Sequence, residues 1–111
     1  MEDLTKKKCV PCENDGFPAL TPAQAADMME HVPGWELSST STMLSRHFKF
    51  KNFAEALAFA NKIGEIAEEE NHHPDLTVSW GKVGVMLTTH SIKGLSENDF
   101  ILAAKINLLP V

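Results

Sequence analysis

The residue pattern changes its period twice in the middle of the chain. Residues 43–51 alternate between apolar and polar side chains, which is the two-residue period of a strand with one buried face. Residues 53–71 instead place apolar side chains at helical spacing, and the alternation returns between residues 76 and 90. Hairpins on both sides of one long helix favour an α+β layer, in which an antiparallel sheet carries its helices on one face.

Capping signals add a helix at each end of this pattern. Thr21, Pro22 and Gln24 predict a capping box that opens a helix, which should run to about Val32 and stop at Pro33-Gly34. Ser96 predicts the cap of a last helix, with Asp99 in its first turn and Leu108 on its buried side. A short strand from Trp35 completes the first hairpin. The predicted fold is therefore α-ββ-α-ββ-α, a four-stranded antiparallel sheet with three helices packed on one face.

The predicted core includes one stripe of the long helix and one aromatic residue outside it. Trp35, just after Pro33-Gly34, reads mainly as a core side chain. The stripe consists of Phe53, Leu57, Ala60, Ile63 and Ala67.

Length and charge limit the possible classes of protein. A chain of 111 residues fits one domain, here residues 21–111, preceded by a flexible segment at 1–20 that lacks periodicity. A net charge of -5 with no basic cluster argues against binding to nucleic acid or to an anionic membrane. No apolar run approaches the roughly 18 residues that a bilayer span requires. No secretory signal opens the chain, so a cytoplasmic location is expected.

Two cysteines, Cys9 and Cys12, lie within the segment expected to be flexible. Their spacing fits half a zinc site or a redox pair, but the chain holds no second cysteine pair. The favoured interpretation is a pair of free thiols, with a zinc site completed by a distant histidine as the alternative.

Histidines gather in one part of the chain: His72 and His73 at the end of the long helix, and His90 late in the predicted fourth strand. Histidine gives and takes protons near neutral pH and is also a common metal ligand. Spacing alone leaves open metal-free acid–base catalysis, a zinc site, a recognition surface, or no relation between the three. His31 and His47 are predicted not to be catalytic, because each fits an ordinary surface position.

Two neighbouring features bear on the same site. Four glutamates crowd the last turns of the long helix, where negative charge opposes the helix dipole. That cost suggests a specific role for at least one of these carboxylates, which are Glu65, Glu68, Glu69 and Glu70. Trp80 reads either as a core aromatic of the third strand or as an aromatic edge beside a flat heterocyclic ligand.

Taken together, these residues resemble the pattern of the pterin-4a-carbinolamine dehydratase family. Pro33-Gly34-Trp35, the segment 48–53 and the segment 89–99 support the resemblance, which covers about residue 21 to the end of the chain. The motif itself consists of Glu68, His72, His73, Pro74, Trp80, His90 and Asp99 in that order.

The resemblance implies loss of water from 4a-hydroxytetrahydropterin to give quinonoid dihydropterin, which recycles the pterin cofactor of aromatic amino-acid hydroxylases. It implies neither a metal nor an organic cofactor. His72 and His90 would be the acid–base groups, and His73 would bind the pterin and assist proton transfer. Substrate contacts would come from Glu68, Asn71, Trp80 and Asp99, where Glu68 and Asp99 orient histidines or substrate. Relatives often carry an acidic residue where this chain has Asn71.

The resemblance also bears on partners. Relatives assemble as dimers or tetramers, so a homodimer or homotetramer is expected, together with a functional link to an aromatic amino-acid hydroxylase. The alternative to an enzyme is a non-catalytic module that binds pterin or dimerises and so regulates a partner protein.

Overall fold

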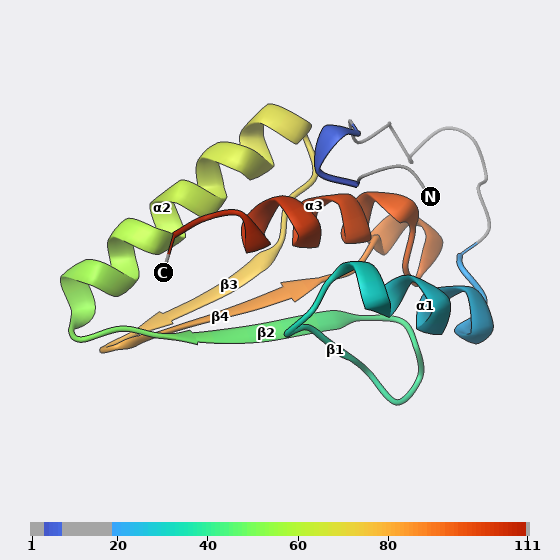
Figure 1. The fold of residues 1–111 in the computed structure, drawn as a ribbon, viewed down its shortest axis with the longest axis horizontal. Helices are drawn as coiled ribbons and strands as arrows, with labels where there is room; N and C mark the ends of the chain where they lie inside the picture. The colour runs from blue at the N-terminus through green and yellow to red at the C-terminus, as the bar shows by residue number, and fades with distance from the viewer. Residues whose placement is uncertain (1–3, 8–18, 111) are drawn as a thin grey trace.

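The computed structural model describes residues 4–7 and 19–110. A four-stranded antiparallel sheet, in the order β1-β2-β4-β3, carries the helices on one face (Figure 1). The predicted α+β class and order of elements are confirmed. In chain order the helices and strands are α1 (Pro22–Met28), β1 (Glu36–Leu37), β2 (Leu44–Lys49), α2 (Phe53–Glu70), β3 (Asp75–Ser79), β4 (Lys82–Leu87) and α3 (Glu97–Asn107). Three short 3-10 turns are η1 (Leu4–Lys6), η2 (Met29–His31) and η3 (His90–Ile92).

The two predicted hairpins join through their inner strands, β2 and β4. Leu44 lies opposite Leu87, and Phe48 lies opposite Val83, so these side chains share the buried face that the helices cover. His47, one residue before Phe48, is on the opposite face of the sheet, where it lies opposite Gly84 and is exposed. The alternation in the sequence therefore predicted the face of β2 correctly, although the strand is shorter than the predicted range of 43–51.

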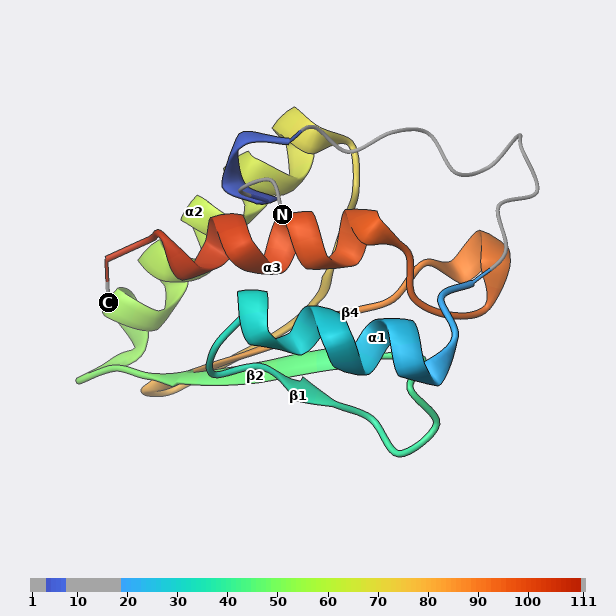
Figure 2. The same ribbon diagram turned by 45° about the vertical axis from the view of Figure 1, so that its right-hand side comes forward.

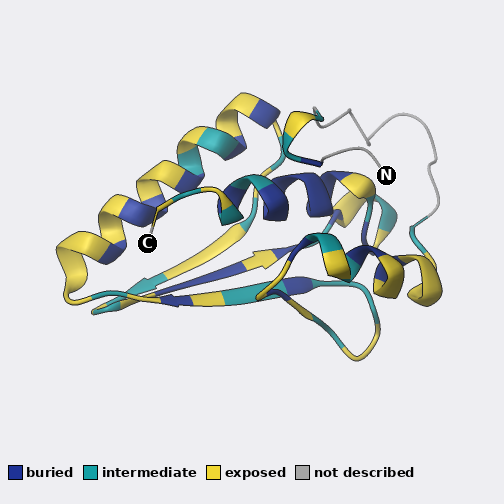
Figure 3. Cartoon of the chain, in the orientation of Figure 1, coloured by how far each residue is buried: buried dark blue, intermediate teal, exposed yellow. Residues whose placement is uncertain are grey.

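The buried stripe of α2 is rotated from its predicted position. Phe53 and Leu57, predicted to be core residues, are 45% and 44% exposed. Phe59 is buried instead, with its ring centroid 4.7 Å from that of Phe48 and 5.1 Å from that of Phe50. These aromatic contacts fix the rotation of the helix, and Figure 3 shows its outer side exposed along the whole length. The buried residues of α2 are Ala56, Phe59, Ala60, Ile63, Ala67 and Glu70.

Helix α3 is the most buried element of the molecule, lying between α2 and α1 above the sheet (Figure 2). Its C-terminal end is tied to the first hairpin through Asn107, whose Oδ1 accepts hydrogen bonds from Trp35 Nε1 at 2.8 Å and from Arg46 Nη1. Leu108 follows the last helical residue and is 69% exposed, so its predicted place in the core is wrong. The opposite end of α3 enters the candidate site described below.

Part of the N-terminal segment packs on this domain. Leu4, in η1, is only 3% exposed and belongs to the hydrophobic core, where η1 contacts α3. Lys7 forms an ion pair with Glu97 at 2.7 Å. Residues 4–7 are therefore part of the packed domain, although the sequence predicted a flexible lead-in over 1–20. Cys9 and Cys12 lie outside the described residues.

No helix among the described residues is both long and apolar enough to cross a membrane.

Candidate active site

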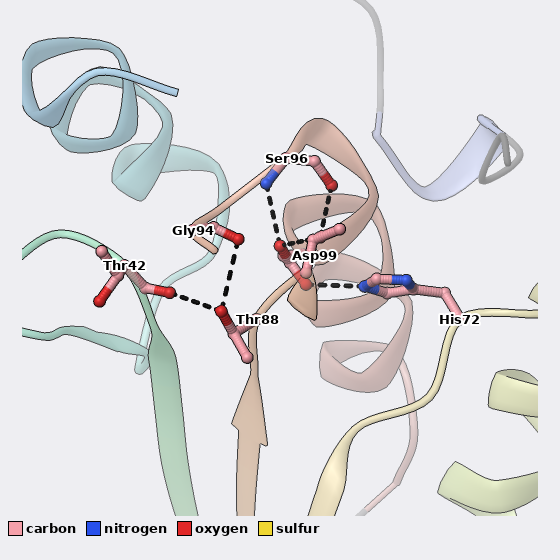
Figure 4. Close-up of polar contacts among 7 residues, drawn as sticks. Thr42, His72, Thr88, Gly94, Ser96 and Asp99 are labelled. Atoms are coloured by element: carbon pink, nitrogen blue, oxygen red, sulfur yellow. Dashed lines mark hydrogen bonds and ion pairs between the residues drawn. The ribbon is translucent and has the colours of Figure 1, made fainter. Parts of the chain in front are cut away.

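A fully buried carboxylate, that of Asp99, lies at the centre of the site. Its Oδ1 is 2.7 Å from Nε2 of His72 (Figure 4). Its Oδ2 accepts hydrogen bonds from the Ser96 backbone N–H at 2.9 Å and from Thr89 Oγ1 at 2.8 Å. The bond from Ser96 is one half of the capping box that starts α3. The sequence predicted Ser96 as the cap and Asp99 in the first turn, but not this reciprocal bond. Asp99 therefore begins a helix and holds a histidine with the same side chain.

The contact with Asp99 decides which nitrogen of His72 holds the proton. An ionised carboxylate offers only acceptor positions, so Nε2 of His72 must donate. In the neutral ring the other nitrogen, Nδ1, then has a free lone pair and can accept a proton. The side chain is 12% exposed, so it is largely enclosed.

Asn71 brings His72 to this position through its backbone. It ends α2 in the left-handed conformation, with φ at 54°, which asparagine tolerates better than most residues. The backbone N–H groups of Asn71 and His72 both bond to the carbonyl of Ala67, so the chain leaves the helix in a tight turn. The predicted role in substrate binding remains a prediction, while the turn itself depends on this residue.

Substitutions at Asn71 separate its backbone role from a side-chain role. Asn71→Ala is expected to lower the free energy of unfolding by about 1 kcal/mol, because alanine is strained in the left-handed conformation. Asn71→Gly should cost less, because glycine adopts this conformation without strain. Urea unfolding of the three proteins measures the difference. A similar rise in KM for both variants would instead favour a direct contact between the Asn71 side chain and the substrate.

His73 and Glu68 form a second, more exposed pair. Nε2 of His73 lies 2.5 Å from Oε2 of Glu68, and the two side chains are 55% and 77% exposed. Glu68 also lines a shallow groove between the outer side of α2 and β3. The groove is lined by Ala60, Asn61, Gly64, Glu65, Glu68 and Leu76. This pair gives the site a polar, solvent-accessible border.

His90 is connected to Asp99 through its neighbour, Thr89. Thr89 is buried and pairs with Gly94 through backbone hydrogen bonds in both directions, which fixes the main chain at His90. The prediction that His90 ends the fourth strand is wrong, because β4 stops at Leu87 and His90 opens the turn η3. The imidazole is exposed. Thus His72 contacts Asp99 directly, whereas His90 is linked to Asp99 only through the main chain of Thr89.

Trp80 is not brought to this cluster within one chain. It lies in the turn between β3 and β4 and is 73% exposed, so of its two interpretations the core aromatic is wrong. The register of the hairpin pairs Asp75 with Met86 near His72, and Ser79 with Lys82 near Trp80. Trp80 and His72 are therefore at opposite ends of β3.

The glutamates at the end of α2 have different surroundings. Glu70 is buried, and its Oε2 accepts a hydrogen bond from Lys105 Nζ of α3 at 2.6 Å. Glu68 pairs with His73, as described above. For Glu68 and Glu70 the unfavourable position relative to the helix dipole is thus offset by these contacts, of which the sequence did not indicate the one between Glu70 and Lys105. Sequence reasoning missed the roles of Lys105 and Thr89: Lys105 belongs to no motif, and Thr89 was noted only within the segment 89–99 that supports the family resemblance.

The remaining histidines lie outside the cluster. His31 is 3.5 Å from its neighbour Glu30, and His47 lies on the exposed face of the sheet. Within residues 4–7 and 19–110, no three side chains of His, Cys, Asp or Glu are grouped so that they could hold a metal ion.

The fold and these side chains define a class: an α+β protein with a buried Asp–His pair and two further histidines at one end of its sheet. The family model described as pterin 4 alpha carbinolamine dehydratase matches residues 18–109. A Methylococcus capsulatus protein that carries the name pterin-4-alpha-carbinolamine dehydratase is 52% identical over 106 residues, 96% of this chain and 92% of that protein. Mitochondrial pterin-4-alpha-carbinolamine dehydratase 2 of Arabidopsis thaliana is 46% identical over 100% of this chain and 61% of its own length.

Solved structures agree with the sequence relatives. A transcriptional coactivator/pterin dehydratase from Brucella melitensis superposes with a TM-score of 0.74 at 32% identity, covering 80% of this chain and 95% of that one. The chain therefore belongs to the pterin-4-alpha-carbinolamine dehydratase family, whose members are hydro-lyases.

Proposed function

We propose that this protein dehydrates a 4a-hydroxytetrahydropterin to quinonoid dihydropterin by histidine acid–base catalysis without a metal. The observation that carries the proposal is the hydrogen bond from His72 to the buried Asp99 carboxylate. Such a pair leaves Nδ1 free to accept a proton and stabilises the imidazolium that results. The family relationship supplies the substrate class.

The reaction requires two proton transfers. His72 takes a proton from the ring nitrogen of the pterin through Nδ1, and the electron pair of that N–H bond forms a C=N bond at C4a. His90, exposed and next to Thr89 in the chain, would act as the acid and give a proton to the 4a-hydroxyl, which leaves as water. Return of a proton from His72 to solvent and uptake of one by His90 restore the starting state.

The more exposed residues would hold the pterin. His73, fixed by Glu68, lies at the solvent-accessible border of the site and would contact the ring and assist proton transfer. Asn71 would contribute through the turn that places His72. Trp80 could reach a pterin only in a neighbouring subunit, since β3 separates it from His72 within one chain.

The direct test is the decay of freshly generated carbinolamine with the purified protein. We expect faster decay than in buffer, the same acceleration in the presence of a chelator, and a loss of about 10²-fold or more in His90→Ala. His31→Ala is the matched control, because this histidine lies outside the cluster. Full activity in His90→Ala would contradict its assigned role as the acid.

Two alternatives give different results in the same assay. A non-catalytic module that binds pterin or dimerises would capture its ligand or partner without accelerating the decay. A zinc enzyme would contain stoichiometric zinc in the native protein and lose it in a His72→Ala variant, which elemental analysis detects.

The partner expectations stay predictions. A homodimer or homotetramer agrees with the exposed apolar side chains of α2 and of the edge strand β3, among them Phe53, Leu57 and Leu76. The link to an aromatic amino-acid hydroxylase is part of the proposed role in pterin recycling, and a location in the cytoplasm is proposed with it.

A further inference from the structure

We propose that Thr89 and Ser96 are positioning residues that hold the Asp99 carboxylate in the orientation that sets the tautomer of His72. The inference rests on the proposed function, in which His72 is the base. Neither hydroxyl contacts the imidazole. Thr89 would act on His72 through the Asp99 carboxylate, and the Ser96 hydroxyl would act through Thr89.

The hydrogen bonds among these groups have only one possible direction. Because the carboxylate of Asp99 accepts only, Thr89 Oγ1 must donate its single hydrogen to Oδ2, at 2.8 Å. Thr89 Oγ1 is also 2.8 Å from Ser96 Oγ, so in that contact Ser96 must be the donor. The two hydroxyls therefore form a chain that points from Ser96 through Thr89 to the carboxylate.

The backbone of Ser96 closes this arrangement. Its N–H donates to the same oxygen, Oδ2, at 2.9 Å, so two donors fix one oxygen of Asp99 and leave the other, Oδ1, facing His72. The direction of the carboxylate is thus determined by groups on the side remote from the histidine (Figure 4).

Burial makes these hydrogen bonds to Asp99 effective. Asp99 is 0% exposed and Thr89 is 4% exposed, so water does not readily replace a missing donor. A hydrogen bond to a charged group is stronger than one between neutral groups, and it is costlier to lose in a buried site. Removing the Thr89 hydroxyl would leave Oδ2 with the Ser96 amide alone and allow the carboxylate to turn.

The neighbouring residue provides a matched control. Thr88 Oγ1 donates to the backbone carbonyl of Thr42 at 2.7 Å and lies 3.3 Å from the carbonyl of Gly94, but it does not contact Asp99. Thr88→Val and Thr89→Val therefore remove the same hydroxyl from adjacent positions, and only the second affects the carboxylate.

The test combines nitrogen chemical shifts with steady-state kinetics. In protein labelled with ¹⁵N-histidine, the ring shifts of His72 report which nitrogen holds the proton, and the His72→Ala spectrum assigns them. Thr89→Val is expected to lower the population of the Nε2–H tautomer and to reduce kcat about 10-fold with little change in KM. Thr89→Ser should restore both, and Thr88→Val should leave both as in the unaltered protein.

The outcomes separate this inference from the proposed function. A folded Thr89→Val variant with the normal tautomer of His72 and normal kcat would overturn it, whatever its melting temperature. If that variant does not fold, Ser96→Ala decides: it keeps the backbone donor and removes the outer hydroxyl, which also caps α3, and an unchanged tautomer of His72 with normal kcat would overturn the inference. If the unaltered protein proves inactive on carbinolamine, the proposed function fails, yet the tautomer measurement still decides whether Thr89 orients His72.

Discussion

A His72→Ala variant is expected to lose about 10²–10⁴-fold of the rate at which the protein dehydrates 4a-hydroxytetrahydropterin. The imidazole is the only group in the described site that combines a proton-accepting nitrogen with a buried carboxylate behind it. Alanine removes the proposed base and leaves the Asp99 carboxylate with an unused acceptor. Stopped-flow measurement of carbinolamine decay over a range of protein concentrations gives the rate constant.

The control for this variant is another histidine on the same scaffold. His47→Ala removes an exposed imidazole from the uncovered face of the sheet, opposite Gly84, and should retain the full rate. Near-normal dehydration by His72→Ala, in protein whose circular dichroism matches that of the unaltered chain, would rule out His72 as the base.

The second large effect concerns stability and involves Glu70. Glu70→Ala is expected to lower the free energy of unfolding by about 3–5 kcal/mol, because it removes one partner of a buried ion pair. The side chains of Glu70 and Lys105 are 2% and 15% exposed, and their contact at 2.6 Å joins the end of α2 to α3. Urea unfolding at one fixed protein concentration measures the loss and keeps any association constant.

Two further variants identify the cause of that loss. Glu97→Gln removes the charge of the more exposed pair with Lys7 and should cost no more than about 1 kcal/mol. The double variant Glu70→Leu with Lys105→Met replaces both charges by apolar groups, and it should recover much of the stability lost in Glu70→Ala. A loss below about 1 kcal/mol in Glu70→Ala would mean that the pair contributes no more than a surface one.

Elements with a clear period were predictable from the sequence, since their pattern reflects local geometry. The face of β2, the capping box at Thr21 and the cap at Ser96 are of this kind, because each depends on residues within a few positions of one another. The rotation of α2 about its axis was not predictable from the sequence. Apolar residues lie on two sides of this helix, and only the rings of Phe48 and Phe50 select the side that carries Phe59.

The site shows the same division between local and distant information. The family motif singled out His72 and Asp99 as members of one site, and the structure places them 2.7 Å apart. Nothing local marks Thr89 as a partner of Asp99, because in the sequence it reads as one more residue of an alternating strand. Lys105 is separated from Glu70 by 35 positions, and such a pairing depends on how two helices pack. The alternation of the third strand suggested a buried face for Trp80, but the residue lies in the hairpin turn after β3, where it is exposed.

The double use of Asp99 has a consequence for protein engineering. The side chain that orients His72 also receives the capping bond that begins α3, so neither use can be altered by substitution without affecting the other. A designer who wished to transplant this histidine into another scaffold would need to move residues 89–99 as one block, together with the helix ending at 70–72. The smallest part of the site that can be transferred is thus the end of α2 together with the segment that links β4 to α3, rather than a set of side chains.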